Sequence, residues 1–315
     1  MQTKEKLAVI ETQAHEKNSL LNELRIARNQ SRQPIEPKDG PVALRTISHK
    51  ANLLAQGDSW FDYPGHDLID YMQFRHGYAV ENIGVAGSTL NDIVYGSVPE
   101  NWFGIPQSES VSRMAELIDL MEKFQPDAVL LSGGGNDIAG DQFFSFVNNA
   151  KSGLSNPNVE VTKGVMKHTF KKAYIDLIEM ILTKAQLMNK QVPIFVHGYD
   201  YPWPDGRGVT FFNIVGPWFH EAFNQKNLPY RNQEELLVRH RIVKILIDEL
   251  NEMLKDLSVQ YSGKVFFIDL RGTLPVPSDW ANELHPTADG FKRLSDKVEH
   301  ALSAVLVQAA AALVN

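Results

Sequence analysis

Two side chains that lie far apart in the sequence have the types that nucleophilic catalysis requires. Ser59 ends the sequence Gly57-Asp58-Ser59 directly after a short apolar run, where a turn of small residues lifts a hydroxyl out of the backbone. His285, held by Pro286 just before a predicted helix, has the side chain of a general base. The pair predicts a serine nucleophile that is activated by a histidine.

A tetrahedral oxyanion needs preorganised hydrogen-bond donors, and the sequence offers three candidates. Two are the backbone N–H groups of Ser59 and Gly87, and a glycine at 87 lets the backbone approach closely without a Cβ in the way. The third is the side-chain amide of Asn136, a donor that adds no charge. We therefore predict an oxyanion hole made by Ser59, Gly87 and Asn136.

The segments that carry these residues are placed by alternating strands and helices. Short apolar runs, mostly bounded by Gly, Pro or Asn, predict strands over residues 51–55, 78–83, 128–132, 193–197 and 265–270. Apolar faces with helical spacing lie between or after them, over about residues 170–185, 236–257 and 291–305. This alternation predicts a parallel sheet covered by helices on both faces, and such sheets bind ligands at the carboxyl ends of their strands.

The chain resembles the SGNH (GDSL) hydrolases in four sequence blocks spread over roughly residues 50–305, which are Gly57-Asp58-Ser59, Gly87, Gly134-Gly135-Asn136-Asp137 and His285-Pro286. The resemblance implies an α/β fold, a flavodoxin-like three-layer α/β/α sandwich whose five-stranded parallel sheet has the order 2-1-3-4-5. It also implies a serine esterase that forms an acyl-serine intermediate without metal or cofactor. Activities in that family span lipases, lysophospholipases, acyl-thioesterases and carbohydrate acetylesterases, and the resemblance leaves the acyl and alcohol groups undecided.

The chain departs from that family at Asn282, three residues before His285, where an aspartate is usual. A carboxylate there accepts the imidazole Nδ1–H and stabilises imidazolium, and its replacement by asparagine costs serine proteases about four powers of ten in kcat. Four interpretations stay open. Asn282 or a backbone carbonyl orients the ring in a Ser-His dyad, Asp279 acts as the acid, Glu283 does so, or the protein is catalytically weak.

Three further residues are candidates for substrate binding. They are Asp58, which we also expect to hydrogen-bond its own loop, His197 at the end of the fourth apolar run, and Trp203. Trp203 belongs to an insertion at about 199–231 that is rich in aromatic residues and too long for a routine connection. We expect this insertion to be either a packed excursion with its own small core or a wall beside the acyl site.

The first part of the chain predicts an N-terminal extension over residues 1–47, ahead of a hydrolase domain over 48–315. Apolar residues at helical spacing predict a helix over 1–30, either docked on its own domain or serving as a homo-oligomerisation arm, and 31–42 has the composition of a linker. The first residues lack the apolar segment of a Sec signal, which predicts a cytoplasmic protein and leaves non-classical export open.

Composition argues against several other classes of function. The formal net charge of −7 disfavours a nucleic-acid-binding surface, and the absence of cysteine excludes disulfides and thiolate metal sites. No pair of histidines has metal-ligand spacing with a carboxylate, so we predict no metal, and no uninterrupted apolar run approaches membrane-spanning length. The expected partner is a small-molecule ester.

Two other functions remain open from the sequence. The first is a catalytically inactive binding module on the same fold, in which Asn282 marks a lost activity. The second is an acyltransferase that passes the acyl group to an acceptor other than water, because the same residues serve both reactions.

Overall fold

A computed structural model describes residues 49–96, 113–209 and 216–314 of the chain. The helix predicted over 1–30 and the linker that follows it lie outside these residues. Within the described ranges, no helix combines the length and the apolar character that a membrane crossing requires.

The centre of the fold is a five-stranded sheet in which each pair of neighbouring strands is parallel. Its strands are β1 (Asn52–Gln56), β2 (Ala79–Asn82), β3 (Ala128–Leu131), β4 (Ile194–His197) and β5 (Val265–Ile268). Their order is β2-β1-β3-β4-β5, which confirms the predicted fold class. All residues of β3 and β4 are buried, because helices cover both faces of the sheet, and this explains their nearly continuous apolar sequences.

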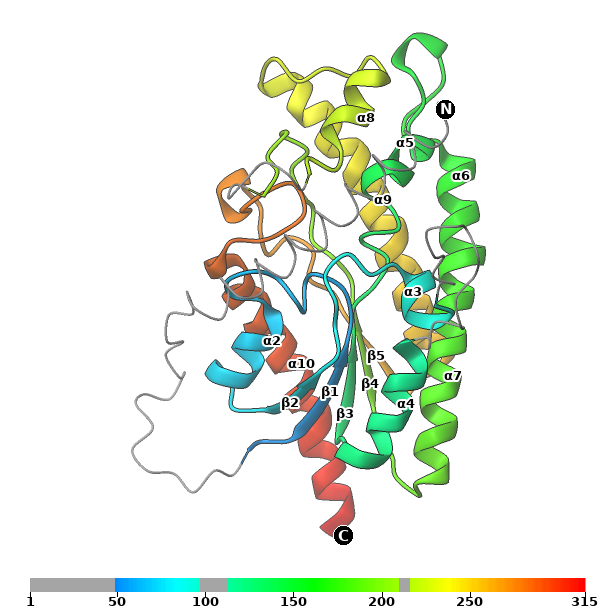
Figure 1. Ribbon diagram of the computed structural model, residues 1–315, viewed down its shortest axis with the longest axis vertical. Helices are drawn as coiled ribbons and strands as arrows, with labels where there is room; N and C mark the ends of the chain where they lie inside the picture. Colours follow the sequence, from blue (N-terminus) through cyan, green and yellow to red (C-terminus); the bar gives the residue numbers. More distant parts are fainter. Residues whose placement is uncertain (1–48, 97–112, 210–215, 315) are drawn as a thin grey trace, which may run out of the picture.

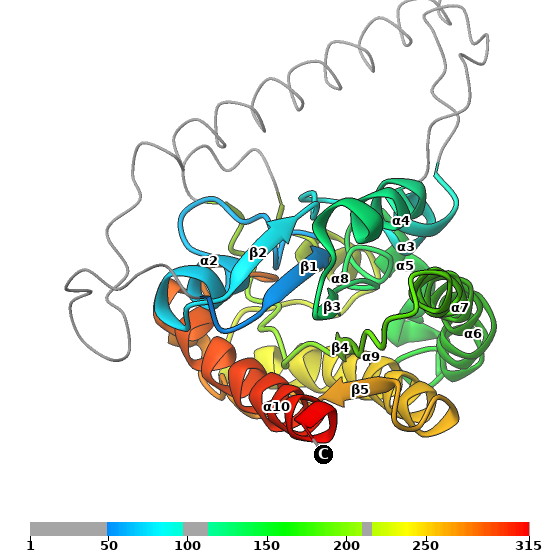
Figure 2. The same ribbon diagram turned by 90° about the horizontal axis from the view of Figure 1, so that it is seen from below.

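Helices form a layer on each face of the sheet (Figures 1 and 2). One layer contains α4 (Arg113–Phe124), α7 (Lys171–Leu187) and α9 (Gln233–Gln260). The other contains α2 (Leu68–Asp70), the π-helical turn Tyr71–Arg75 that continues it, and α10 (Ala288–Val314). The three apolar faces found in the sequence belong to α7, α9 and α10, whose buried side chains complete the core against the sheet.

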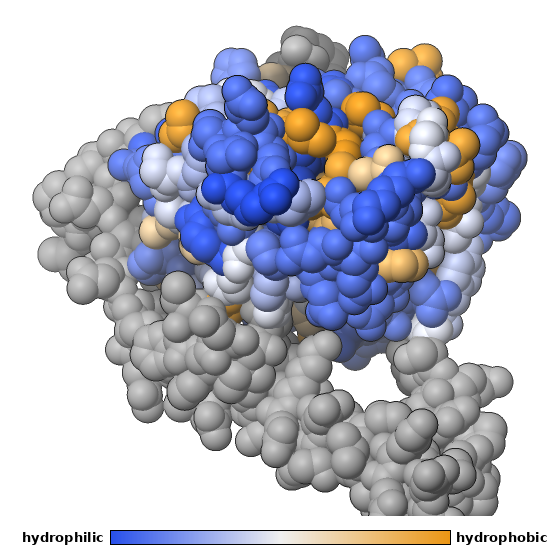
Figure 3. All heavy atoms as spheres, turned by 90° about the horizontal axis from the view of Figure 1, so that it is seen from above, coloured by the Kyte–Doolittle hydropathy of each residue, from blue (hydrophilic) through white to orange (hydrophobic). Residues whose placement is uncertain are grey.

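Shorter elements connect these layers. They are α3 (Leu90–Val94), α5 (Phe143–Phe146), α6 (Val159–Gly164), α8 (His220–Gln225), a π-helical stretch over Val165–Phe170, and single 3₁₀ turns at Gly140–Gln142, Ala150–Ser152 and Pro277–Asp279. α8 and the loops that follow the strands lie beyond the carboxyl ends of the sheet (Figure 1). Seen from that end, apolar residues gather near the middle of the described surface and hydrophilic residues border them (Figure 3).

The described parts of the aromatic insertion form a small packed cluster with α5. Phe219 and Phe223 lie edge-on to Phe143, with ring centroids 4.7 and 4.9 Å away, and all three rings are buried. Arg207 joins this insertion to the segment before α10, because its guanidinium donates to the carbonyls of Trp280 (2.7 Å) and of Pro277 (3.0 Å). The insertion is therefore anchored on two sides.

Candidate active site

Ser59 lies in a tight turn directly after β1, and the neighbouring carboxylate of Asp58 shapes that turn. Asp58 is buried and accepts hydrogen bonds from the N–H of Trp60 (3.0 Å), the hydroxyl of Ser132 (3.1 Å) and the hydroxyl of Tyr199. These donors compensate for part of the cost of burial, which still raises the pKa of Asp58. These hydrogen bonds of Asp58 fix the conformation of the turn, which places Ser59 at the carboxyl edge of the sheet.

The hydroxyl of Ser59 faces the imidazole of His285. Ser59 Oγ and His285 Nε2 are 2.7 Å apart, a hydrogen-bonding distance between residues separated by 226 positions in the sequence. His285 follows the 3₁₀ turn Pro277–Asp279 and lies in a loop that an isolated antiparallel bridge between Trp280 and Pro286 closes. The structure thus brings together the two residues predicted to be nucleophile and base.

Asn282 orients the imidazole from the other side. Its Oδ1 lies 2.9 Å from His285 Nδ1 and accepts the backbone N–H groups of Leu284 and His285, each at 2.9 Å. Its Nδ2 donates to the hydroxyl of Tyr63 at 3.0 Å. A flipped amide would place its NH₂ against two backbone donors, so the network fixes the amide as described. Nδ1 of His285 then carries the proton, and Nε2 is free to accept the Ser59 hydroxyl proton.

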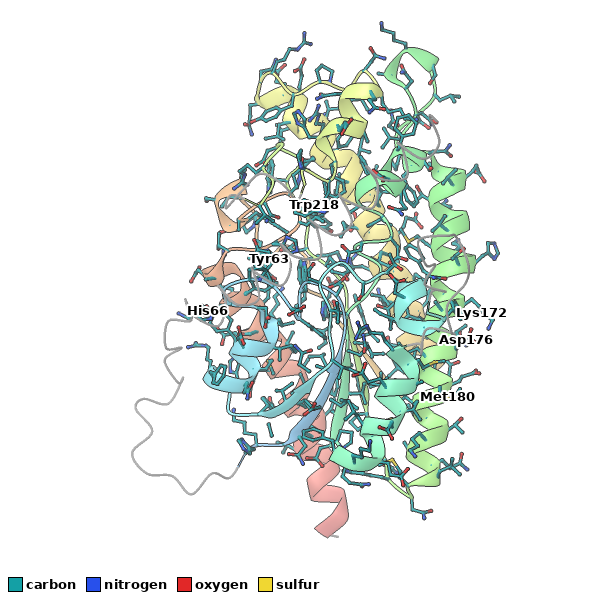
Figure 4. The ribbon with its side chains drawn as sticks, viewed as in Figure 1. Tyr63, His66, Lys172, Asp176, Met180 and Trp218 are labelled. Atoms are coloured by element: carbon teal, nitrogen blue, oxygen red, sulfur yellow. The ribbon has the colours of Figure 1, made fainter. Side chains whose placement is uncertain are left out.

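The imidazole of His285 is enclosed by two aromatic side chains. Tyr63 stacks on it with a centroid distance of 4.2 Å and an interplanar angle of 20°, and Trp218 contacts it edge-on at 5.4 Å. Figure 4 shows Tyr63 and Trp218 beyond the strands, whereas Lys172, Asp176 and Met180 face outward on α7. Burial lowers the pKa of His285 to about 3, because desolvation disfavours imidazolium and Asn282 supplies no opposing charge.

Asp279 and Glu283, the two alternative acids, are engaged elsewhere. The carboxylate of Asp279 pairs with Arg293 and accepts the N–H of Val276 at 3.2 Å. Glu283 is buried, and its carboxylate accepts backbone N–H groups of the aromatic insertion. Of the four interpretations, the geometry corresponds to a dyad whose histidine is oriented by Asn282.

The two other predicted oxyanion donors lie in loops that pack around the Ser59 turn. Gly87 has a φ of +83°, a left-handed conformation that favours glycine. Its loop is tied to the loop after β1, because the N–H of Ala86 donates to Asp62 at 3.0 Å. The amide of Asn136 donates one N–H to the carbonyl of Ser88 at 3.0 Å, which orients it and leaves the second N–H for a ligand.

Ser59 and Asn136 share a cavity of about 30 Å³. Its lining comes from the loops after β1, β3 and β4, from the insertion, from α9 and from the segment before His285. Of the described residues, no group of three His, Asp or Glu side chains forms a site that could hold a metal ion.

The predicted substrate-binding residues His197 and Trp203 are not among the residues that line this cavity. His197 is buried between Trp60 and Phe61, with ring centroids 5.7 and 5.4 Å away, because these bulky side chains cover the end of β4. Trp203 is buried and stacks on His240 at 3.9 Å. Asp58 does line the cavity, but hydrogen bonds to its own fold engage its carboxylate.

Sequence reasoning missed Tyr63 and did not single out Trp218. Tyr63 lies in the coil before α2, where no periodic pattern or motif distinguishes it. Trp218 belongs to the aromatic stretch that was identified, and its contact with His285 supports the expectation that this stretch is a wall beside the site. Phe219 and Phe223 show that the same stretch also has a small packed core.

The sequence of the chain matches one known protein family. The family model of GDSL-like lipases and acylhydrolases matches residues 52–298 of the chain. A search of curated proteins gave no match.

Similar solved structures have low sequence identity to the chain. An extracellular lipase from Streptomyces rimosus is 13% identical, with a TM-score of 0.49 over 79% of this chain and 99% of its own. A carbohydrate acetylesterase from Sinorhizobium meliloti is 15% identical, with a TM-score of 0.47 over 81% of this chain and 100% of its own. A GDSL-like protein from Bacteroides ovatus is 15% identical, with a TM-score of 0.43 over 82% of this chain, which spans only 54% of that protein.

Proposed function

The chain belongs to the GDSL-like lipase/acylhydrolase family, and on this premise we propose that it hydrolyses carboxylic esters through an acyl-serine intermediate. The observation that supports this most directly is the 2.7 Å contact between Ser59 Oγ and His285 Nε2, in a ring whose Nδ1 is held by Asn282. In this proposal Ser59 is the nucleophile and His285 the general base.

Acylation begins with a proton transfer from the hydroxyl of Ser59 to Nε2 of His285. As the proton leaves, Oγ attacks the ester carbonyl carbon, and the carbonyl oxygen becomes an oxyanion. The N–H groups of Ser59 and Gly87 and the free N–H of Asn136 are the proposed donors for this charge. When the C–O bond to the alcohol breaks, imidazolium gives its proton to the departing oxygen.

Deacylation repeats these steps with water. His285 takes a proton from water, the oxygen attacks the acyl carbon, and the same donors hold the second oxyanion. Collapse releases the carboxylic acid and returns the proton to Ser59. Asn282 can fix the tautomer throughout, but it stabilises imidazolium less than a carboxylate would. We therefore expect turnover below that of a relative with aspartate at this position.

Active-site labelling and hydrolysis together test this proposal. We expect the protein to hydrolyse p-nitrophenyl acetate and to be labelled by a fluorophosphonate at Ser59, whereas Ser59→Ala should lose both. Ser258→Ala is a matched control, because this exposed hydroxyl bonds only to the carbonyl of Lys255 near the end of α9. A correctly folded wild-type protein that is neither labelled nor active would overturn the proposal in favour of a binding module.

A further inference from the structure

The size and position of the cavity beside Ser59 limit which acyl groups it can hold. Its volume of about 30 Å³ has room for roughly two or three water-sized groups. Apart from the edge of the Ser59 turn, its walls include the apolar side chains of Ile138, Phe219, Ile247 and Leu284. Such a space fits one or two carbon atoms beyond the carbonyl, and a longer chain would extend beyond it or press on its walls.

The geometry of proton transfer decides which half of an ester enters this cavity. The departing alcohol oxygen receives its proton from Nε2 of His285, so the alcohol must lie on the side of that ring. The described residues that line the cavity include Ser59 and Asn136 but not His285. The cavity therefore lies on the acyl side of the carbonyl.

Phe219 is the wall that the later part of the insertion contributes, whereas Tyr199 and Pro202 line the cavity from its start, directly after β4. Its side chain is 1% exposed, and its ring lies edge-on to Phe143 at 4.7 Å, which leaves it little freedom to turn away. The other apolar walls belong to regular elements or to the loops after strands. Phe219 is thus the wall whose position depends on how the insertion is attached.

Glu283 makes that attachment. One carboxylate oxygen accepts the N–H of Trp218 (2.6 Å) and of Phe219 (2.8 Å), and the other accepts the N–H of Gly206 (2.9 Å). The backbone N–H of Glu283 also donates to the carbonyl of Arg207 at 3.1 Å. A fully buried carboxylate is costly unless donors surround it, and here three backbone donors from the insertion do so.

We propose that the enzyme acts on esters of short acyl groups, of about two or three carbons, that Phe219 sets this limit, and that Glu283 is a positioning residue that holds Phe219 in place. This inference rests on the proposed ester hydrolysis. It assigns to Glu283 a role in selectivity, because the hydrogen bonds of its carboxylate go to the backbone of the insertion that carries Phe219.

Chain-length profiles test the proposal. For wild type, kcat/KM on p-nitrophenyl butyrate should fall at least about 10-fold below that on the acetate, with a further fall on the octanoate, because each methylene that cannot be accommodated costs about 10-fold or more. In Phe219→Ala, and in the milder Phe219→Leu, the butyrate-to-acetate ratio should rise by at least about 10-fold. Phe266→Ala, which removes a ring of β5 stacked on Phe195, is a matched control that should keep the wild-type ratio.

Glu283→Gln tests the positioning role. Both carboxylate oxygens accept backbone N–H groups, so the NH₂ group of the glutamine must face at least one backbone donor, and the attachment of the insertion that carries Phe219 should weaken. We expect the butyrate-to-acetate ratio to rise, a change in selectivity that a loss of folding alone would not give, because misfolding lowers both rates equally.

The outcomes separate this inference from the proposed function. Ser59 labelling with equal or faster hydrolysis of the octanoate would overturn the acyl limit and leave ester hydrolysis standing. An unchanged ratio in both Phe219 variants, or a Glu283→Gln variant with the wild-type profile, would remove the assigned roles. A wild-type protein without labelling or hydrolysis would overturn both proposals together.

Discussion

The side-chain oxygen of Asn282 lies 2.9 Å from Nδ1 of His285, so an amide occupies the position in which a catalytic triad has a carboxylate. The same oxygen is fixed by two backbone N–H groups, and the amide nitrogen by Tyr63. The amide can therefore perform one of the two tasks of the carboxylate, orientation of the ring, without the other, stabilisation of its positive charge.

Asn282→Asp should restore the missing charge. Aspartate is nearly isosteric, and the Tyr63 hydroxyl can turn to donate to it, so we expect the fold to persist and kcat at pH 8 to rise by roughly 10- to 100-fold. The carboxylate should also raise the pKa of His285, which burial lowers to about 3 in the wild type. Because the base must be neutral, activity is lost below this pKa, and the acid limb of the pH–rate profile should move to higher pH. Superimposable profiles for the two proteins would contradict this account.

Tyr63→Phe should affect stability more than chemistry. The change leaves Nδ2 of the buried Asn282 without its acceptor, which should lower the free energy of unfolding by about 1–3 kcal/mol. Because two backbone N–H groups still hold the amide oxygen, we expect kcat to fall by no more than about 10-fold. Denaturant unfolding and steady-state kinetics measure both, and Tyr63→Leu, which also removes the stacked ring, is the comparison. A loss of more than about 100-fold in Tyr63→Phe would assign the hydroxyl a chemical role.

Asp279→Ala should keep its activity. Its carboxylate bonds to Arg293 and to the N–H of Val276, so we expect kcat within about 3-fold of wild type and a loss of stability of about 0.5–2 kcal/mol. Asn282→Ala, three residues along, should instead lower kcat by at least about 100-fold, since the ring loses its orienting partner. A large loss of kcat in Asp279→Ala together with nearly full kcat in Asn282→Ala would show that Asp279, and not Asn282, orients His285.

His197 should make the fold sensitive to acid. Burial lowers the pKa of His197 to about 4, whereas in the unfolded chain it is about 6.5. Between about pH 6.5 and pH 4, His197 is therefore protonated in the unfolded chain and neutral in the folded protein. The free energy of unfolding falls as pH decreases over this range, and His197 contributes up to about 1.4 kcal/mol per pH unit to this fall.

His197→Phe should remove that contribution, since a phenyl ring can occupy the space beside Trp60 without titrating. Guanidinium unfolding at pH 7.0 and 4.5 measures it. The variant should lose about 2–3 kcal/mol less than wild type between these two pH values. The contribution of His285 is present in both proteins and cancels. Equal losses would show that His197 does not resist protonation in the fold.

The fold could be predicted from sequence because its signals are local. The ends of each of the five strands lie within two residues of the ends of the apolar run that predicted it. The order β2-β1-β3-β4-β5 agrees with the order that the family resemblance implies. Ser59, Gly87 and Asn136 could be placed at one edge because each follows a strand of a parallel sheet, and His285 because it precedes the last helix.

The partners of these residues could not be predicted in the same way. Asp279, Asn282 and Glu283 all lie near His285 in sequence, and only the path of the loop shows that their side chains reach different partners. The carboxylate of Glu283 bonds to backbone groups 64 to 77 positions away, contacts that no local pattern encodes. His197 ends its strand at the expected edge, but the cover that Trp60 forms over it depends on tertiary packing.

Ser59 and His285 are 226 positions apart in the sequence, so the nucleophile is synthesised well before its base. The ribosome synthesises the strand before the nucleophile first, and β5 and the turn that carries the histidine follow only after three further strands. A contact of such long range forms late in folding, because a long stretch of chain must be ordered before its ends can meet. A nascent chain in which β5 and His285 have not yet been synthesised therefore has the proposed nucleophile but not its base.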